Sequence, residues 1–481
     1  MRAGGPRAQR TQRIRTRGRD EFCLSECAAL ALLGTLLVLA AITAHAKGDP
    51  TAAPLPVATS QQPATPAPSH AAPPWPGPRA RVYVLRVDFP DRASSRPVSD
   101  FKNPGGNGLV DRMQDYWKEV SLGRLVIDTA VSSHVYRLPK ARARYLSRPG
   151  DLIRDAIGLA TQPGEDAEKA RLEAFAPDVV VVFFAGPGAE SDMERRQPGL
   201  PWSNAYGGIA IARIGEQVLR RGMVVAEEPL HGLSPYGVLN HEFGHVLGLP
   251  ELYAPGKAHE GIGVWGLMGQ GTWLGMGERP PHPEAWSKLQ LGWVDPIDVE
   301  TTQRVRLPLV ERSGQVVRIR TGRDGEVFLI ENRARVGADR GLKGEGLLIW
   351  HVDESRKSFR RSQDDPRHKR LDLLTADRLP SDLDVGHARG GNRGDAGDPW
   401  ADRRLGPQPG GAPSTDAYDG APGRFAIRNI SPAGEVMEFD VVFTGDGTTA
   451  PGPVQTPRQA TPPARSESTP GPSGAGGTSE D

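Results

Sequence analysis

Cysteine is almost missing from this chain of 481 residues. The two cysteines, Cys23 and Cys27, both lie near the N-terminus, in a segment that we expect to be removed. The remaining chain then has no thiol and can form no disulfide, even in a compartment that would permit one. Its stability must therefore come from burial of apolar surface, helped by bound ions.

Net charge is also small, because 59 lysines and arginines are balanced by 58 aspartates and glutamates, which leaves a formal charge of +1. Such a balance gives no strong field toward nucleic acid or an acidic partner, so we expect no nucleic acid to bind. The charge is unevenly placed, since a run of arginines fills the first nineteen residues. This local excess is typical of a targeting segment.

Residues 1–46 have the three parts of a secretory signal peptide. The arginine-rich start is followed by an apolar run, Ala28–Ile42, and then by Ala44-His45-Ala46. We expect cleavage after Ala46 and a secreted, extracellular protein. An uncleaved signal anchor is the alternative, because the apolar stretch is barely long enough to span a bilayer and the arginines would stay in the cytoplasm. Only in that case would the protein be membrane-anchored, with its bulk facing outside.

Large apolar residues are scarce in two further segments. Residues 47–79 form a linker rich in proline, alanine, serine and threonine, with almost no large apolar residue before Trp75. Residues 446–481 have a similar composition with more glycine. Such segments cannot bury enough surface to fold, so we expect a flexible linker and a disordered tail.

The region between these segments has the patterns of an α+β protein. Apolar, β-branched runs predict buried strands at Val82–Phe89 and Asp178–Phe184. A helical spacing of apolar residues predicts a helix at Leu109–Val120. We assign these elements to a first domain, residues 80–295.

The pattern changes after Trp293, where short strand-like runs are separated by turn residues. This rhythm predicts an all-β domain, a sandwich, at residues 296–445. A polar insert near residues 355–422 interrupts it. An insert of that length is more often functional or mobile than packed.

The strongest local pattern is His241-Glu242-Phe243-Gly244-His245, an H-E-x-x-H sequence. On a helix, residues i and i+4 lie on one face, so His241 and His245 can bind one ion together. Zinc accepts imidazole nitrogen, and Glu242 would face the reacting water and act as general base. A chance match on a solvated helix is the alternative, since short patterns also occur by accident.

The residues around the motif argue against chance. Ser234-Pro235 provides a helix cap and a proline suited to the first turn. Gly248 can end the helix in a left-handed conformation, and Pro250 prevents its resumption. The chain then turns back, so that Glu251 can be the third zinc ligand and leave one position open, as in catalytic sites.

Several stretches of the sequence resemble the immune inhibitor A-type (M6) metallopeptidases, relatives of the metzincins. They are V-L-R-V-D-F-P-D at Val84–Asp91, D-Y-W-K-E-V-S-L-G-R-L at Asp115–Leu125, the zinc motif, G-V-W-G-L-M-G-Q-G-T-W at Gly263–Trp273, A-W-S-K-L-Q-L-G-W at Ala285–Trp293 and N-R-G-D-A-G-D-P-W at Asn392–Trp400. The resemblance implies a metzincin-like peptidase domain, with a twisted mixed sheet and an active-site helix. It implies an exported zinc endopeptidase that acts on proteins or peptides. It also implies that Met268 forms a turn beneath the metal, for which a plain core methionine is the alternative.

The chain departs from this family pattern in two places. Many metzincins have histidine as the third ligand, whereas relatives of this chain commonly use a carboxylate, as Glu251 would be. Family members often carry a long propeptide, but here only the linker precedes the expected fold. A latency device that uses cysteine is excluded if residues 1–46 are removed.

Four residues near the motif are weaker ligand candidates. His259 or Glu260 could replace Glu251, although loop histidines are more often merely exposed. Glu278 or Glu284 would serve a zinc site whose carboxylate lies farther along the chain. Gly248 and the segment around Met268 disfavour that second arrangement.

Three further sets of residues have both a functional and a structural interpretation. Tyr253 could polarise a substrate carbonyl, or lie half-buried under the ligand turn. Glu227-Glu228 could bind a basic group of a peptide, or be an exposed acidic pair. Asp395 and Asp398 lie in a glycine-rich loop that could bind calcium, although their spacing differs from that of an EF-hand.

These patterns favour a secreted zinc endopeptidase with a carboxy-terminal β domain for substrate or surface contact. A zinc exopeptidase or a glycan-directed hydrolase is one alternative, and it would need a cleft closed at one end. An extracellular binding or adhesion protein with an idle zinc site is another. Glu242 argues against the idle site, because a metal without turnover needs only its ligands.

Overall fold

The computed structural model describes residues 75, 77–146, 148–192, 196–254, 258–358, 361–377, 382–386, 390–445 and 452–455. All of them belong to one unit, Pro66–Asp481. The predicted signal peptide, nearly all of the linker and most of the tail lie outside the described residues. Within the described residues, the helices are all too short or too polar to cross a membrane.

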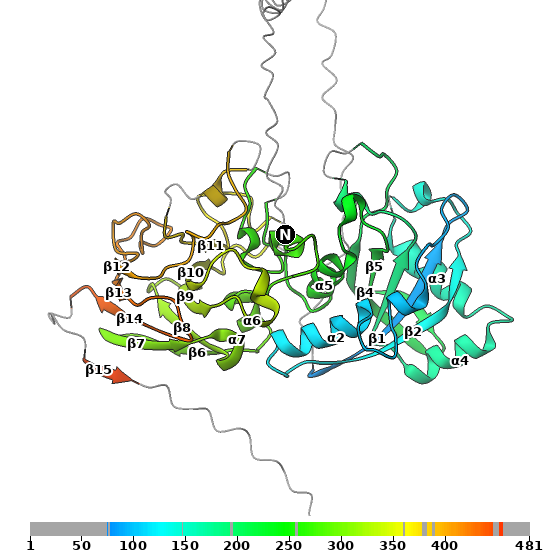
Figure 1. Cartoon of the computed structure of the whole chain (residues 1–481), viewed down its shortest axis with the longest axis horizontal. Helices are drawn as coiled ribbons and strands as arrows, with labels where there is room; N and C mark the ends of the chain where they lie inside the picture. Colours follow the sequence, from blue (N-terminus) through cyan, green and yellow to red (C-terminus); the bar gives the residue numbers. More distant parts are fainter. Residues whose placement is uncertain are drawn as a thin grey trace, which may run out of the picture. The chain divides into compact units, whose positions relative to one another are not determined.

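A five-stranded mixed sheet occupies the first half of the described chain (Figure 1). Its strands are β1 (Arg79–Asp88), β2 (Val126–Arg137), β3 (Val179–Phe184), β4 (Asn204–Ile214) and β5 (Gln217–Ala226). Their order is β2-β1-β3-β5-β4, and neighbouring strands are parallel except β4, which is antiparallel to β5. β4 is therefore an edge strand, and among the described strands it pairs on one side only.

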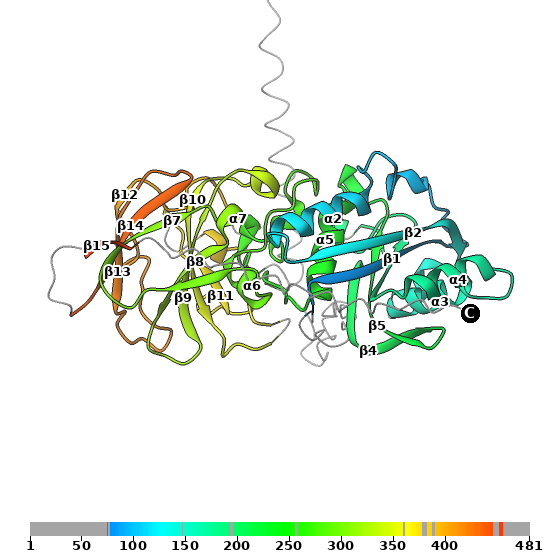
Figure 2. The same ribbon diagram turned by 90° about the horizontal axis from the view of Figure 1, so that it is seen from below.

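Helices cover both faces of this sheet (Figure 2). They are α2 (Leu109–Val120), α3 (Gly150–Ala160), α4 (Asp166–Phe175) and α5 (Pro235–Val246). Because strand side chains alternate, Val82 and Val84 of β1 share a core with α2 and α5, whereas Tyr83 and Leu85 share a second core with α3 and α4. Both faces of the sheet are thus buried, which explains its near-continuous apolar strands.

The second half of the described chain forms two more five-stranded sheets. Their strands are β6 (Asp295–Asp298), β7 (Gln303–Pro308), β8 (Gln315–Arg320), β9 (Glu326–Arg333), β10 (Gly346–Asp353), β11 (Leu371–Leu373), β12 (Arg403–Leu405), β13 (Phe425–Ile430), β14 (Val436–Phe443) and β15 (Gly452–Gln455). The orders are β11-β10-β9-β8-β6 and β12-β13-β14-β7-β15. Phe328 and Ile349 of one sheet share a core with Phe425 and Phe439 of the other.

A continuous core joins the two halves of the described chain. Trp350 and Leu348 on β10 belong to the same buried cluster as Trp117 on α2 and Phe243 on α5. β10 therefore packs on both faces, with Ile349 in the β-region core and Trp350 toward the helices. The sequence-based boundary near residue 295 stays a prediction, because one buried cluster includes residues of both halves.

The structure corrects one expectation about the polar insert. Leu371–Leu373 forms β11 at the edge of a sheet, and Trp400 is buried and pairs with Leu347 through backbone hydrogen bonds of 2.9 Å. Lys369 is buried between Asp372 and Asp384, so charge inside the insert is neutralised by pairing. The insert is polar in sequence yet packed in its described parts, where the buried charge of Lys369 is paired with carboxylates.

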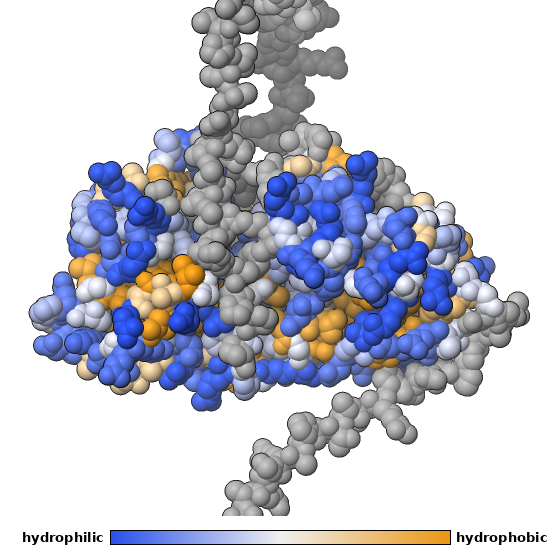
Figure 3. Space-filling model, turned by 180° about the vertical axis from the view of Figure 1, so that it is seen from behind, coloured by the Kyte–Doolittle hydropathy of each residue, from blue (hydrophilic) through white to orange (hydrophobic). Residues whose placement is uncertain are grey.

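Most of the face drawn in Figure 3 is hydrophilic, and apolar residues gather there in smaller areas. Over the described residues, seven large apolar side chains are exposed, and they belong to scattered elements: Val98, Val126, Val135, Ile209, Met276, Leu405 and Val436. Single exposed apolar residues are ordinary on soluble proteins, so they mark no binding surface.

Candidate functional site

Helix α5 begins and ends as the sequence predicts. The hydroxyl of Ser234 accepts a hydrogen bond from the backbone N–H of Tyr236, and Pro235 occupies the first turn. At the other end, Gly248 has a φ of 102°, a left-handed conformation that favours glycine. The Leu249 N–H then donates to the carbonyl of Gly244, which turns the chain back toward the helix.

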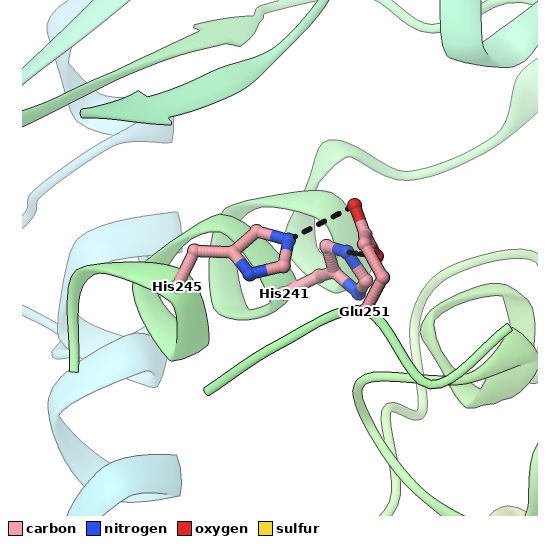
Figure 4. A group of neighbouring side chains, drawn as sticks. All are labelled: His241, His245 and Glu251. Carbon is pink, nitrogen blue, oxygen red and sulfur yellow. Dashed lines mark ion pairs between the residues drawn. The ribbon is translucent and has the colours of Figure 1, made fainter. Parts of the chain in front are cut away.

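This turn brings Glu251 to the two histidines of α5 (Figure 4). Glu251 Oε2 lies 3.3 Å from His241 Nε2, and Glu251 Oε1 lies 3.2 Å from His245 Nε2. The ligand atoms of the three residues all lie within 4.8 Å of one another. Ligand atoms about 2.0–2.1 Å from a tetrahedral zinc are about 3.3–3.4 Å apart. The two nitrogen-to-oxygen distances, each to a different carboxylate oxygen, are close to that value.

Backbone carbonyls fix the orientation of both imidazole rings. His241 Nδ1 lies 3.1 Å from the carbonyl oxygen of Leu267, and His245 Nδ1 lies 2.8 Å from that of Leu249. A carbonyl can only accept, so each Nδ1 carries the proton and each Nε2 presents a lone pair toward Glu251. Such outer contacts are typical of histidines that bind metal.

The charge of Glu251 also fits a metal ligand. Burial favours the neutral acid, but positive charge on the rings of His245 and His241 outweighs it and holds the pKa of this carboxyl well below its usual range. A cation bound between neutral rings would act in the same direction. Its Oε2 is buried and accepts no hydrogen bond of normal geometry from the described residues. A buried carboxylate oxygen in that position needs a partner, and a cation between the three side chains would provide one.

Glu242 is buried beside the two histidines, with 8% of its surface exposed. The edge strand β4 packs against α5, and the backbone N–H of Ala205 lies near this carboxyl group. Burial raises the pKa of Glu242 to about 8, with Glu251 and Glu190 adding repulsion and His241 opposing them. A cation held by His241 would add to that opposition and favour the carboxylate, the form that a general base requires.

Met268 lies directly against the helix that carries the ligands. A Cβ placed on Gly244 would come within 2.4 Å of Met268 Sδ, so only glycine leaves room for this side chain. The carbonyl of Met268 accepts the Leu252 N–H at 3.0 Å, which ties its loop to the ligand turn. Tyr253 lies nearby, with its ring 6.2 Å from that of His241. The special roles of Met268 and Tyr253 stay predictions.

The weaker ligand candidates lie away from this group. His259 is buried near Lys369, and Glu260 pairs with Arg393 at 3.4 Å. Glu284 caps the short helix α6 (Ala285–Gln290) through the N–H of Ser287. Glu278 pairs with Arg112 at 2.6 Å. Among the described residues, the carboxylate that joins the two histidines is Glu251.

The contacts of the acidic pair Glu227-Glu228, which precedes α5, indicate a structural role. Glu227 is fully buried and accepts hydrogen bonds from the hydroxyl of Ser94 and the N–H of Ser95. Burial raises the pKa of Glu227, against the effect of these hydrogen bonds. Glu228 pairs with Arg92 at 2.7 Å on the wall of a cavity of about 600 Å³. The expectation of an exposed acidic pair is therefore wrong for Glu227.

The predicted calcium residues lie together with a third aspartate, Asp377. Asp398 accepts hydrogen bonds from Trp265 Nε1 at 2.7 Å and from the Asp395 N–H at 3.0 Å. Asp395 in turn accepts the N–H of Gly397. These contacts give the carboxylates a structural role without an ion, and calcium binding stays a prediction.

Two residues near Glu242 carry no sequence signal that would single them out. Glu190, in the short turn η3 (Ala189–Ser191), accepts hydrogen bonds from both the N–H and the hydroxyl of Ser203. Burial raises the pKa of Glu190, against the effect of these hydrogen bonds. Glu190 and Ser203 both lie far from the H-E-x-x-H motif in the sequence, and no local pattern marks either residue.

Residues 227–294 match the family model described as immune inhibitor A peptidase M6, catalytic domain. The matched segment contains α5, the ligand turn, the loop of Met268 and α6. No curated protein matches the chain. The family match confirms the resemblance predicted from the sequence, and it supports a metallopeptidase.

Proposed function

We propose that this M6-family metallopeptidase is a secreted, zinc-dependent endopeptidase that hydrolyses peptide bonds in proteins. The observation that carries the proposal is the group formed by His241, His245 and Glu251, whose ligand atoms all lie within 4.8 Å of one another, close enough to share one ion. Three protein ligands leave one position for water or substrate, as in catalytic zinc sites. The proposed base, Glu242, is buried on the same helix and follows His241 directly in the sequence.

The residues of the chain have separate roles in the reaction. When bound, zinc supplies a Lewis acid that makes water acidic near neutral pH and polarises the scissile carbonyl. His241 and His245 hold the ion through Nε2, because their Nδ1 atoms are held by carbonyls. The Glu242 carboxylate takes the proton of the attacking water and then gives it to the nitrogen of the leaving amine.

The edge strand β4 supports cleavage inside a chain rather than at its end. An extended peptide can add to an open strand edge through main-chain hydrogen bonds. β4 packs against α5, the helix of Glu242, so a peptide paired along β4 would pass the general base with residues on both sides of the scissile bond. An exopeptidase would instead need a group that closes one end of the cleft.

Secretion, in this proposal, depends on the predicted signal peptide at residues 1–46. Cleavage after Ala46 would release the catalytic region outside the cell, and retention of the apolar run would anchor it to the membrane with the same orientation. N-terminal sequencing of the mature protein distinguishes the two cases.

The test is Glu242→Gln in the full chain, assayed on a protein substrate. Loss of the general base should lower kcat about 10²–10⁴-fold while zinc content stays equal to that of the wild type. Glu300→Gln, an exposed glutamate far along the chain, is the matched control and should keep full activity. Mass spectrometry of the products should show internal cleavage. Full activity of Glu242→Gln would overturn the mechanism, and a zinc-loaded wild type without turnover would favour an idle binding site.

A further inference from the structure

We infer that Glu190 is a positioning residue, which acts through Ser203 to fix the start of β4 against the general base Glu242. The inference rests on the proposed function, because it concerns the residue that moves the proton. Glu190 lies outside the matched family segment, in the turn η3 that follows β3.

The contacts of Glu190 tie its turn to the start of β4. Its Oε1 accepts the hydroxyl of Ser203 at 2.6 Å, and its Oε2 accepts the Ser203 N–H at 3.1 Å. The Ser203 oxygen accepts the N–H of Ala226 at the end of β5, at 3.0 Å. Ser203 is therefore held from two directions, by the turn and by the neighbouring strand.

The local backbone is shaped for this carboxylate. A Cβ placed on Gly188 would come within 2.1 Å of Glu190 Oε1, so glycine is what allows the side chain to fold back over its own turn. The N–H of Ala189 also donates to the carbonyl of Pro201 at 2.8 Å. The turn and the segment before β4 are thus joined by backbone as well as side chain.

Two residues beyond Ser203, the N–H of Ala205 lies near the carboxyl group of Glu242, and β4 packs against the helix α5 that carries this glutamate. Ser203 directly precedes β4, and only Asn204 separates it from Ala205. A shift of Ser203 must therefore move Ala205. Ala205 is also at the edge that a substrate would use in the proposed function. Glu190 therefore sets two distances together, from β4 to the base and from the base to a bound peptide.

The experiment compares four variants of the full, zinc-loaded protein: Glu190→Ala, Glu190→Gln, Ser203→Ala and Ser191→Ala. Ser191→Ala is the matched control, because Ser191 lies in the same turn and makes two hydrogen bonds, with Gly188 and Leu230, but none with β4. Each variant is assayed for kcat and KM on a protein substrate, for zinc content, and for hydrogen exchange of the Ala205 amide.

If Glu190 is a positioning residue, the four variants should differ from one another in kinetics and in exchange of the Ala205 amide. Glu190→Ala and Ser203→Ala should lower kcat/KM on the order of 10–100-fold, the range for small misplacement of reacting groups. The Ala205 amide should exchange faster in both, with zinc content unchanged. Glu190→Gln should keep most activity, because an amide can accept the Ser203 N–H and donate to the Ser203 oxygen. Ser191→Ala should match the wild type in all readouts.

Two results would overturn the inference. One is a Glu190→Ala protein and a Ser203→Ala protein whose kinetics and Ala205 exchange equal those of Ser191→Ala. The other is a Glu190→Gln protein as impaired as Glu190→Ala, which would assign the effect to charge. If Glu190→Ala does not fold, Ser203→Ala decides alone. Failure of the proposed function is distinguishable, because it would remove turnover from the wild type and leave the exchange pattern intact.

Discussion

Gly244→Ala tests directly how closely the ligand helix is packed. Gly244 lies between Glu242 and His245 on α5, and the added Cβ would come within 2.4 Å of Met268 Sδ. Met268 is fully buried, so its side chain has little free space into which to move. Either the methionine adopts a strained rotamer or the helix moves away from it, together with His241 and His245.

The magnitude follows from two opposing terms. Overpacking a well-packed core costs about 1–3 kcal/mol. Replacing glycine by alanine within a helix stabilises it by about 0.5–1 kcal/mol. Gly158→Ala, at an exposed position of α3, measures the gain in helix stability alone, because a Cβ there meets nothing within 4 Å. Gly244→Ala should thus be less stable than Gly158→Ala by about 1–3 kcal/mol, the full overpacking term.

The assay is chemical denaturation of the zinc-loaded variants, followed by two spectroscopic probes whose transitions must coincide. Zinc retention is measured in parallel by competition with a chelator. Gly244→Ala should release zinc more readily, because His241 and His245 move with the helix. A Gly244→Ala protein as stable as Gly158→Ala, with unchanged zinc retention, would refute the tight contact between Met268 and the helix.

Three further predictions follow from contacts of named residues. Glu251→Ala should weaken zinc binding by at least about 10–100-fold, as measured by chelator competition, and unchanged affinity would exclude Glu251 as a ligand. Arg333→Leu should lower the free energy of unfolding by about 3–5 kcal/mol, because it leaves Asp339 buried without its two 2.7 Å hydrogen bonds. Burial and the nearby Lys369 lower the pKa of His259, so the folded protein keeps this ring neutral while the unfolded chain takes up a proton below about pH 6.5. Stability should therefore fall as pH drops from about 7 to 5; His259→Asn should flatten part of this slope in a denaturation series, and an unchanged slope would contradict the assignment.

The sequence predicts best the elements whose signals are local. α2 has the predicted bounds, Leu109–Val120, because its apolar residues recur at helical spacing. β3 lacks only the first predicted residue of the run Asp178–Phe184. The caps of α5 and the turn at Gly248 follow from residue types with strong backbone preferences. These local signals were enough to predict that Glu251 lies close to the two histidines.

Elements with weak local signals could not be predicted. α4 (Asp166–Phe175) is mostly polar and buries only Glu168 and Leu172, so its sequence has no apolar stripe. β4 contains two adjacent glycines and does not alternate regularly, although it borders the site. Its place at the sheet edge depends on pairing with β5, which local pattern does not encode. Glu190 is found through Ser203, thirteen residues away, a contact that exists only after folding.

The β-rich region contributes to the geometry of the metal group, although the family match ends at residue 294. Arg333 on β9 donates to the carbonyl of Trp265 at 3.4 Å, and Asp398 of the insert accepts the indole N–H of the same tryptophan at 2.7 Å. Two residues farther along, the carbonyl of Leu267 fixes the ring of His241. The loop that orients this ligand is therefore held from the β-rich side by a buried guanidinium and a buried carboxylate. Because outer contacts set the direction of a ligand's lone pair, the β-rich region helps to orient the candidate metal-binding group, in addition to any role in substrate contact.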